Sequence, residues 1–125
     1  MRKALIVGIN NYDKANQLMG CENDANAVKD ILSFHADDRR NFTIIEPKRN
    51  IKTRAGLFAE IEELFDGNTE TDVALFYFSG HGGYNTQKKD GLIVSSDCVP
   101  IYMREILDIV NTSKCRNRIV VLDSC

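Results

Sequence analysis

The alternation of short apolar runs with amphipathic segments constrains the fold of this chain more than any other feature. Three runs rich in branched apolar residues are too short for helices and are typical of buried strands. They are residues 3–9, 72–78 and 118–122, with a shorter run at 42–45. Between them, apolar residues recur at helical spacing. Strands separated by helices predict an α/β fold, with a mostly parallel sheet and helices on both faces.

The predicted helices span residues 22–35 and 53–65, and a third opens at Pro100, because proline suits the first turn of a helix. Asn23 or Asp24 is suited to cap the first helix, and Gly67 to end the second. A polar excursion at 84–90 precedes a short strand or hairpin arm at 91–94. With no repeat or linker in the sequence, we expect residues 1–125 to form one domain.

Two unusual loops follow predicted strands, at the edge of a parallel sheet where binding crevices lie. Residues 79–83 read Ser-Gly-His-Gly-Gly, and residues 123–125 read Asp-Ser-Cys. Glycines beside His81 would permit positive φ and a close approach to a ligand. A histidine there is a candidate general base, and Cys125 is a candidate nucleophile that this base would activate. The structural alternatives are a tight turn with an incidental histidine and a buried cysteine at a strand end.

The remaining histidine and cysteines lack such a setting, so we expect structural roles for His35, Cys21, Cys98 and Cys115. Their spacing predicts no zinc site and no disulfide framework, which favours a reducing, cytoplasmic compartment. The net charge of −2 argues against nucleic-acid binding. Apolar runs are too short to span a bilayer, and the basic start resembles a first strand rather than a signal peptide.

The two loops and the start of the chain carry a family resemblance. Residues 73–82 resemble the histidine motif of metacaspases, paracaspases and caspases, and residues 119–125 resemble the nucleophile motif of metacaspases. Residues 4–12 and 18–25 look like that family's first strand and the loop after it. The histidine and cysteine are 44 positions apart (125 minus 81), near the spacing of caspases, but the Gln-Ala-Cys form of caspases is absent.

The resemblance implies a caspase-like p20-type catalytic domain that ends at the nucleophile and lacks the small-subunit strands. It implies a cysteine endopeptidase in which Cys125 attacks, His81 transfers protons, and the N–H groups of Gly82 and Cys125 form an oxyanion hole. A small p10-type subunit or a downstream segment would complete the enzyme, since the domain alone would leave a sheet edge and apolar surface exposed.

The resemblance also implies cleavage after Arg or Lys, with Asp24, Ser79 and Asp123 lining the pocket for the basic side chain. Paired carboxylates in a partly dry pocket select such cations. The alternatives are that Asp24 caps its helix and that Asp123 bonds to loop backbone.

No cofactor is expected. Many metacaspases bind calcium through aspartates after the histidine motif, for which this chain offers Asp90 and Asp97. These two supply only part of the six to eight oxygens that calcium takes, and residues 103–105 replace an acidic pair. Two other functions stay open: a catalytically silent caspase-like interaction domain, and a nucleotide-binding domain with residues 80–83 as phosphate loop. The absence of GxGxxG weakens the second.

Overall fold

A four-stranded parallel sheet forms the centre of the computed structural model, which describes residues 1–67 and 69–124. The strand order is β2-β1-β3-β7, and all three pairings are parallel. The strands are β1 (Arg2–Gly8), β2 (Thr43–Ile44), β3 (Val73–Gly80) and β7 (Asn117–Ser124). The predicted parallel sheet is therefore confirmed.

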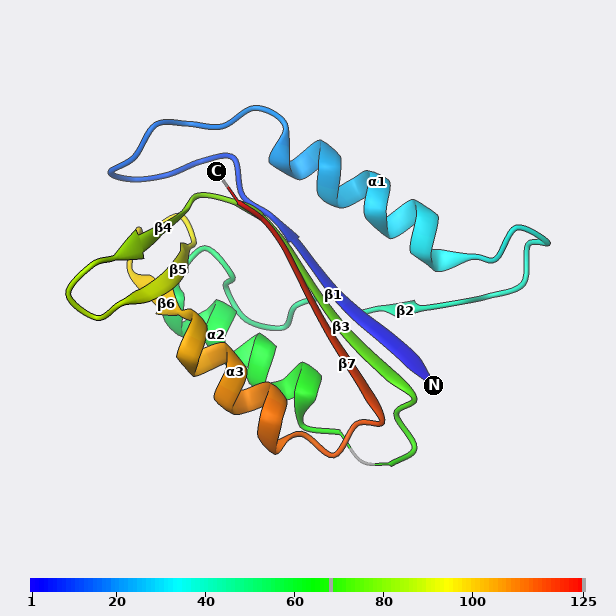
Figure 1. The fold of residues 1–125 in the computed structure, drawn as a ribbon. Coiled ribbons are helices and arrows are strands. Elements are labelled where there is room, and N and C mark those ends of the chain that lie inside the picture. The colour runs from blue at the N-terminus through cyan, green and yellow to red at the C-terminus, as the bar shows by residue number, and fades with distance from the viewer. Residues whose placement is uncertain (68, 125) are drawn as a thin grey trace.

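Helices cover both faces of this sheet, as predicted (Figure 1). One face carries α1 (Cys21–Ser33), and the other carries α2 (Arg54–Phe65) and α3 (Met103–Thr112). Side chains of β3 alternate between two cores: Leu75 and Tyr77 pack on the α1 side, whereas Phe76 and Phe78 pack with residues of α2 and α3. This period of two is the reason that a nearly continuous apolar run builds a strand buried on both faces.

A second, antiparallel sheet follows β3 directly. It is made of β4 (Gly82–Asn85), β5 (Asp90–Val94) and β6 (Pro100–Tyr102). The expected hairpin arm is present, but the expectation of a helix opening at Pro100 is wrong. Pro100 lies in β6 and the helix begins at Met103. A proline is tolerated there because β6 is an edge strand of its sheet.

The start of α1 also differs from the prediction. Neither Asn23 nor Asp24 caps the helix, which begins at Cys21 without a side-chain cap from its own N-cap residue. Instead the Asn10 Oδ1 atom accepts the N–H groups of Cys21 at 3.0 Å and Glu22 at 3.2 Å. The first turn of α1 is thus tied to the loop that leaves β1.

Two glycines serve close packing rather than special backbone angles. The helix α2 ends at Phe65, as predicted, and Gly67 follows the C-cap residue Asp66, but without the positive φ of a left-handed cap, which no glycine among the described residues has. A Cβ atom on Gly67 would lie 2.5 Å from the Cys115 Sγ atom. One on Gly8 would lie 2.2 Å from the Cys21 carbonyl oxygen, so α1 rests directly on the backbone of β1.

The strand β7 forms an exposed edge of the parallel sheet, because within the described ranges it pairs only with β3. Ile119 and Val121 of β7 are each 41% exposed, and they pair with Leu75 and Tyr77, which face α1. An exposed edge strand with apolar side chains offers unpaired backbone groups and apolar area to a further strand.

Candidate active site

The two loops predicted to carry chemistry follow neighbouring strands. β3 and β7 run in parallel register to their ends, where Ser79 pairs with Asp123 and Gly80 pairs with Ser124. His81 comes directly after this last pair. Cys125 comes next after Ser124 in the sequence but lies outside the described residues.

His81 is half-buried and held by the loop between β1 and α1. Its Nε2 atom lies 2.6 Å from the Asn16 carbonyl oxygen. Because a carbonyl only accepts hydrogen bonds, this contact requires the hydrogen on Nε2 and leaves Nδ1 of the neutral ring as the basic nitrogen. The Tyr12 ring packs edge-on against the imidazole with the centroids 4.5 Å apart.

The backbone of His81 is also held by Tyr12. The Tyr12 hydroxyl accepts the His81 N–H at 2.8 Å and donates to the Val94 carbonyl at 3.2 Å. The Val94 N–H in turn donates to the His81 carbonyl at 3.1 Å. The loop between β1 and α1, strand β5 and His81 are therefore joined by hydrogen bonds around the buried side chain of Tyr12.

The glycines flanking His81 are explained by space. Since no described glycine has positive φ, the expected left-handed backbone is wrong here. A Cβ atom on Gly80 would lie 2.5 Å from the Tyr12 hydroxyl, and one on Gly82 would lie 2.7 Å from the Ser124 Oγ atom. Gly80 admits the tyrosine that holds His81, and Gly82 admits the end of β7.

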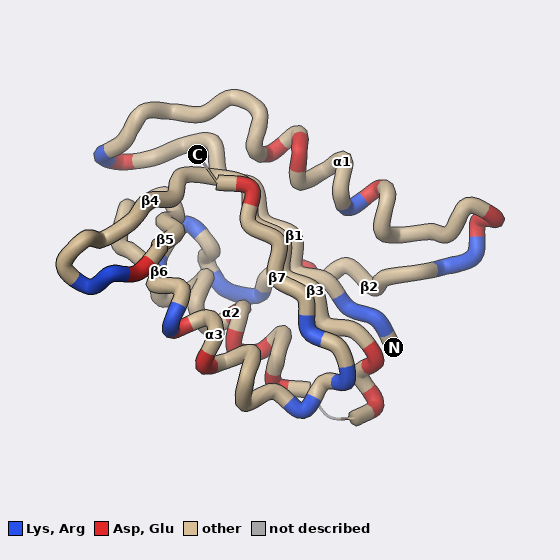
Figure 2. Tube along the Cα trace, in the orientation of Figure 1, with Lys and Arg blue, Asp and Glu red and all other residues tan. Residues whose placement is uncertain are grey.

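The three residues predicted to line a pocket for a basic substrate side chain lie on the α1 side of the sheet. Ser79 is buried beside Asp123, and the Tyr77 hydroxyl lies 3.3 Å from the Asp123 Oδ2 atom, to which it donates. Burial raises the pKa of Tyr77, and so do the negative charges of Asp123 and Asp24. Figure 2 shows acidic segments at the start of α1 and at the end of β7.

The same contacts bear on the alternatives for the two acids. Asp24 does not cap α1, since Asn10 does so. Among the described residues, Asp123 accepts a hydrogen bond from a tyrosine side chain and none from loop backbone. Both carboxylates are solvent-exposed, so the partly dry pocket expected from the sequence is not formed by the described residues alone.

The two calcium candidates cap helices. The Asp90 Oδ2 atom accepts the Arg104 N–H at 3.1 Å in the first turn of α3. The Asp97 Oδ2 atom accepts the Arg54 N–H at 2.7 Å at the start of α2, and its Oδ1 atom accepts from Val99 at 3.2 Å. Carboxylates at helix N-termini are favourable in their own right. Across residues 1–67 and 69–124, no three acidic, histidine or cysteine side chains cluster as a metal site would require.

The other thiols and the second histidine lie in structural settings. Cys21 and Cys115 are buried, and Cys98 occupies a turn with φ of 60°. The second histidine, His35, follows α1, and its Nε2 atom lies 3.4 Å from the Nη1 atom of Arg2 at the start of β1. Sequence reasoning missed Asn16 and the hydroxyl of Tyr12 as partners of His81. The Asn16 contact uses a backbone carbonyl, which has no signature in a sequence.

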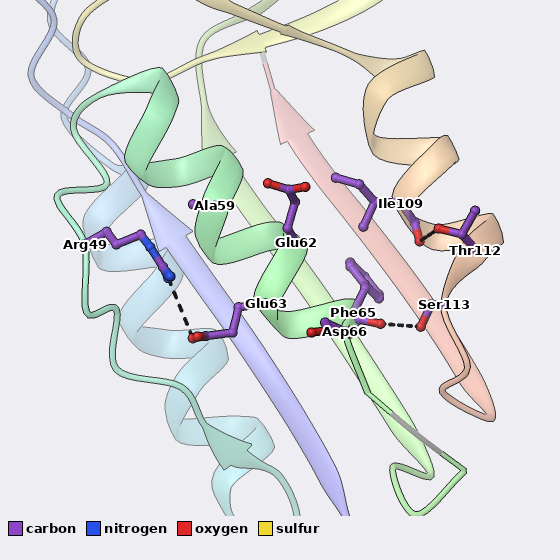
Figure 3. Close-up of a pocket in the computed structure, with 9 residues that line it drawn as sticks. All are labelled: Arg49, Ala59, Glu62, Glu63, Phe65, Asp66, Ile109, Thr112 and Ser113. Atoms are coloured by element: carbon purple, nitrogen blue, oxygen red, sulfur yellow. Dashed lines mark hydrogen bonds and ion pairs between the residues drawn. The ribbon is translucent and has the colours of Figure 1, made fainter.

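A hollow of about 470 Å³ lies away from His81, between the C-terminal halves of α2 and α3 (Figure 3). Acidic side chains of Glu62, Glu63 and Asp66 line it, and Arg49 lies 3.8 Å from Glu63 across its rim. Both hydroxyls among its described lining residues donate to backbone carbonyls, Ser113 to Phe65 at 2.6 Å and Thr112 to Asp108 at 2.9 Å. None of the described helices is long and apolar enough to cross a membrane.

Comparisons with known proteins show the family of this chain. Residues 1–125 match the family model Peptidase C14, caspase domain. Metacaspase-1 of Kluyveromyces lactis is 34% identical over 96 residues, which cover 72% of this chain and 22% of that protein. Metacaspase-1 of Cryptococcus neoformans is 36% identical over 101 residues, covering 72% and 21%. The chain therefore spans about a fifth of the length of these curated relatives.

A crystal structure of a Geobacter sulfurreducens protein has the same fold, with a TM-score of 0.77 and 24% identity over all of this chain and 51% of the other. The family model covers every residue, including both loops at the strand ends. On the strength of that match and of the metacaspase relatives, this chain belongs to the Peptidase C14 family as a caspase domain.

Proposed function

We propose that this chain carries the catalytic dyad of a cysteine endopeptidase, with Cys125 as nucleophile and His81 as general base. The observation that supports it best is the parallel register of β3 and β7, after whose final pair both residues follow. Both positions follow the carboxyl ends of neighbouring parallel strands, the edge at which binding crevices of such sheets lie.

The chemistry uses the tautomer that Asn16 selects. The Cys125 thiol gives its proton to the His81 Nδ1 atom, and the thiolate attacks the carbonyl carbon of the scissile peptide. The tetrahedral intermediate collapses when the imidazolium protonates the leaving amine, which leaves a thioester on Cys125. Water, deprotonated by His81, then hydrolyses the thioester and regenerates the thiol.

The N–H groups of Gly82 and Cys125 would bind the oxyanion in each step. The Val94 N–H donates to the His81 carbonyl, so His81 and Val94 lie opposite each other as a hydrogen-bonded pair where β4 and β5 begin to pair. In an antiparallel ladder, hydrogen-bonded pairs alternate with pairs whose N–H groups point away from the partner strand. Gly82 and Ile93 form the next pair and are therefore of this second type. Such an orientation leaves the Gly82 N–H free of the ladder for a substrate oxygen.

The test compares the full-length protein with Cys125→Ala and His81→Ala variants, using fluorogenic peptides. We expect each variant to lose activity by on the order of a thousandfold or more. Cys98→Ala and His35→Ala are matched controls, since both residues lie outside the dyad, and their activity should stay unchanged. Undiminished cleavage by Cys125→Ala would end the assignment.

For specificity, we propose cleavage after Arg or Lys, with the substrate's cation between Asp24 and Asp123 beside Ser79. Supporting it is the shared effect of both carboxylates on the pKa of Tyr77. Asp24→Asn and Asp123→Asn should each lower kcat/KM for Arg and Lys peptides by on the order of a hundredfold. Asp30→Asn, an exposed acid elsewhere on α1, is the control. Equal turnover of peptides with Asp at that position would defeat the proposal.

We further propose that a small-subunit segment adds a strand along β7 and covers Ile119 and Val121. Their exposure and the unpaired outer side of β7 within the described chain support this. Amide hydrogen exchange on the full-length protein should show protection of alternate β7 amides that face outward. Rapid exchange of all of them would contradict it.

A further inference from the structure

The loop between β1 and α1 is closed by one side chain. The Gln17 Oε1 atom accepts the Tyr12 N–H at 2.7 Å, and the Gln17 Nε2 atom donates to the Tyr12 carbonyl at 2.7 Å. A primary amide offers a donor and an acceptor side by side, so it matches both polar groups of one residue's backbone. Gln17 thereby fixes residues 12–17 as a ring.

This ring contains both groups that hold His81. Tyr12 meets the histidine through its hydroxyl and its ring, and Asn16, the residue before Gln17, meets the Nε2 atom through its carbonyl. Residues 13–17 are exposed and have no apolar anchor in the core. A backbone bond from Asp13 to the Ser96 carbonyl at 2.9 Å ties one side of the ring to the body. On the other side, Leu18 packs against the core and its N–H donates to the Asn10 carbonyl at 2.8 Å. Between Leu18 and Asn16, the two hydrogen bonds of the Gln17 amide are the tie next to Asn16.

We propose that Gln17 is a positioning residue for His81. By holding the Asn16 carbonyl against the Nε2–H group, it keeps the imidazole in the tautomer whose Nδ1 atom accepts the proton of the nucleophile. Gln17 does not contact the reacting atoms. The expected change in kcat rests on the proposed peptidase function. The expected tautomer of His81 rests only on the contact between its Nε2 atom and the Asn16 carbonyl.

Loosening the ring of residues 12–17 should lower kcat more than it changes KM. Without the two amide bonds, the Asn16 carbonyl moves on the exposed loop and no longer selects a tautomer. The neutral imidazole then populates the form with hydrogen on Nδ1, which cannot accept a proton there. Displacement of a catalytic group by about 1 Å can cost roughly a hundredfold in rate, so we expect kcat to fall by about 10- to 100-fold. KM should stay within about twofold, since no substrate contact is removed.

The experiment uses the full chain with Gln17→Leu and Gln17→Glu. The leucine removes both hydrogen bonds; the glutamate keeps the acceptor for the Tyr12 N–H and loses the donor. Gln87→Leu is the matched control, because Gln87 is exposed on the β4–β5 turn. The first readout is the ¹⁵N NMR signal of the His81 ring, which distinguishes Nδ1 from Nε2 protonation. The second is the separate measurement of kcat and KM.

We expect mixed tautomers and the kcat loss in Gln17→Leu, a smaller effect in Gln17→Glu, and none in Gln87→Leu. An unchanged ¹⁵N signal of the His81 imidazole in Gln17→Leu overturns the inference, even if thermal stability falls. If that variant does not fold, Gln17→Glu decides in the same way. Absence of Cys125-dependent cleavage in the wild type would refute the proposed function instead, while the ring signal still tests the positioning role.

Discussion

Gly80→Ala probes the packing that holds His81. The added Cβ atom would lie 2.5 Å from the Tyr12 hydroxyl and 2.7 Å from the Phe78 ring. No described glycine has positive φ, so the substitution strains contacts and leaves the backbone angles allowed. Overpacking of this kind costs about 1–3 kcal/mol of unfolding free energy. Reduced entropy of the unfolded chain offsets about 0.4–1 kcal/mol of that cost.

The hydroxyl of Tyr12 makes the prediction sharper through a double-mutant cycle. Tyr12→Phe removes two hydrogen bonds, to Val94 and from His81, at a cost of roughly 1–2 kcal/mol. In the double variant the atom nearest to the new Cβ is gone, so part of the overpacking cost disappears. The combined loss should fall short of the sum by about 1 kcal/mol or more.

Urea denaturation of the two single variants and the double variant measures this coupling. Gly83→Ala is the control, because among the described residues its Cβ atom would meet the Leu92 Cδ1 atom alone, at an ordinary contact distance of 3.8 Å. That variant should keep or slightly raise the stability. Strict additivity of Gly80→Ala and Tyr12→Phe would refute the account of Gly80 as the space for the tyrosine.

Three further predictions concern other contacts. Tyr77→Phe should raise KM for Arg peptides, because Asp123 loses the donor that orients it; kinetics with Arg peptides check this. Since the pKa of Tyr77 is raised from 10.0 in the folded state, wild-type stability should fall as pH rises above 10, and the variant's stability should fall less in alkaline unfolding scans. Asp90→Ala and Asp97→Ala should each cost roughly 1 kcal/mol, because alanine cannot accept the helix N–H groups that these carboxylates cap. The loss should be equal with and without calcium in thermal unfolding; a loss confined to calcium buffer would contradict the capping role. Arg54→Lys should cost about 1–3 kcal/mol in urea titrations, because lysine cannot keep the bonds to the Pro100 carbonyl and Glu105.

The strands and helices were predictable because burial periodicity is local. Apolar runs and helical spacing mark them without knowledge of the tertiary fold, and parallel order places their loops at one sheet edge. Helix starts were less predictable. The cap of α1 comes from Asn10, eleven positions before Cys21, and the caps of α2 and α3 include aspartates from other segments. Long-range caps leave no fixed spacing in a sequence.

The environment of His81 was predictable only in part. Glycines around a histidine suggested special backbone angles, yet the structure uses them for space, which depends on what packs against them. Pro100 was assigned to a helix because its ring suits a first turn, but the pairing with β5 places it on an edge strand. Neighbours distant in sequence decided both positions.

The contact between Gly8 and the start of α1 has a consequence for substrate selection. Gly8 pairs with Ser79, and α1 lies against it so closely that an added methyl would overlap the Cys21 carbonyl. The first turn of the helix that carries Asp24 therefore leaves no room for a side chain at position 8. Any larger side chain at position 8 can only push this helix outward. Variation at this one position would widen the proposed cation site toward bulkier substrates, and no substitution there could narrow it.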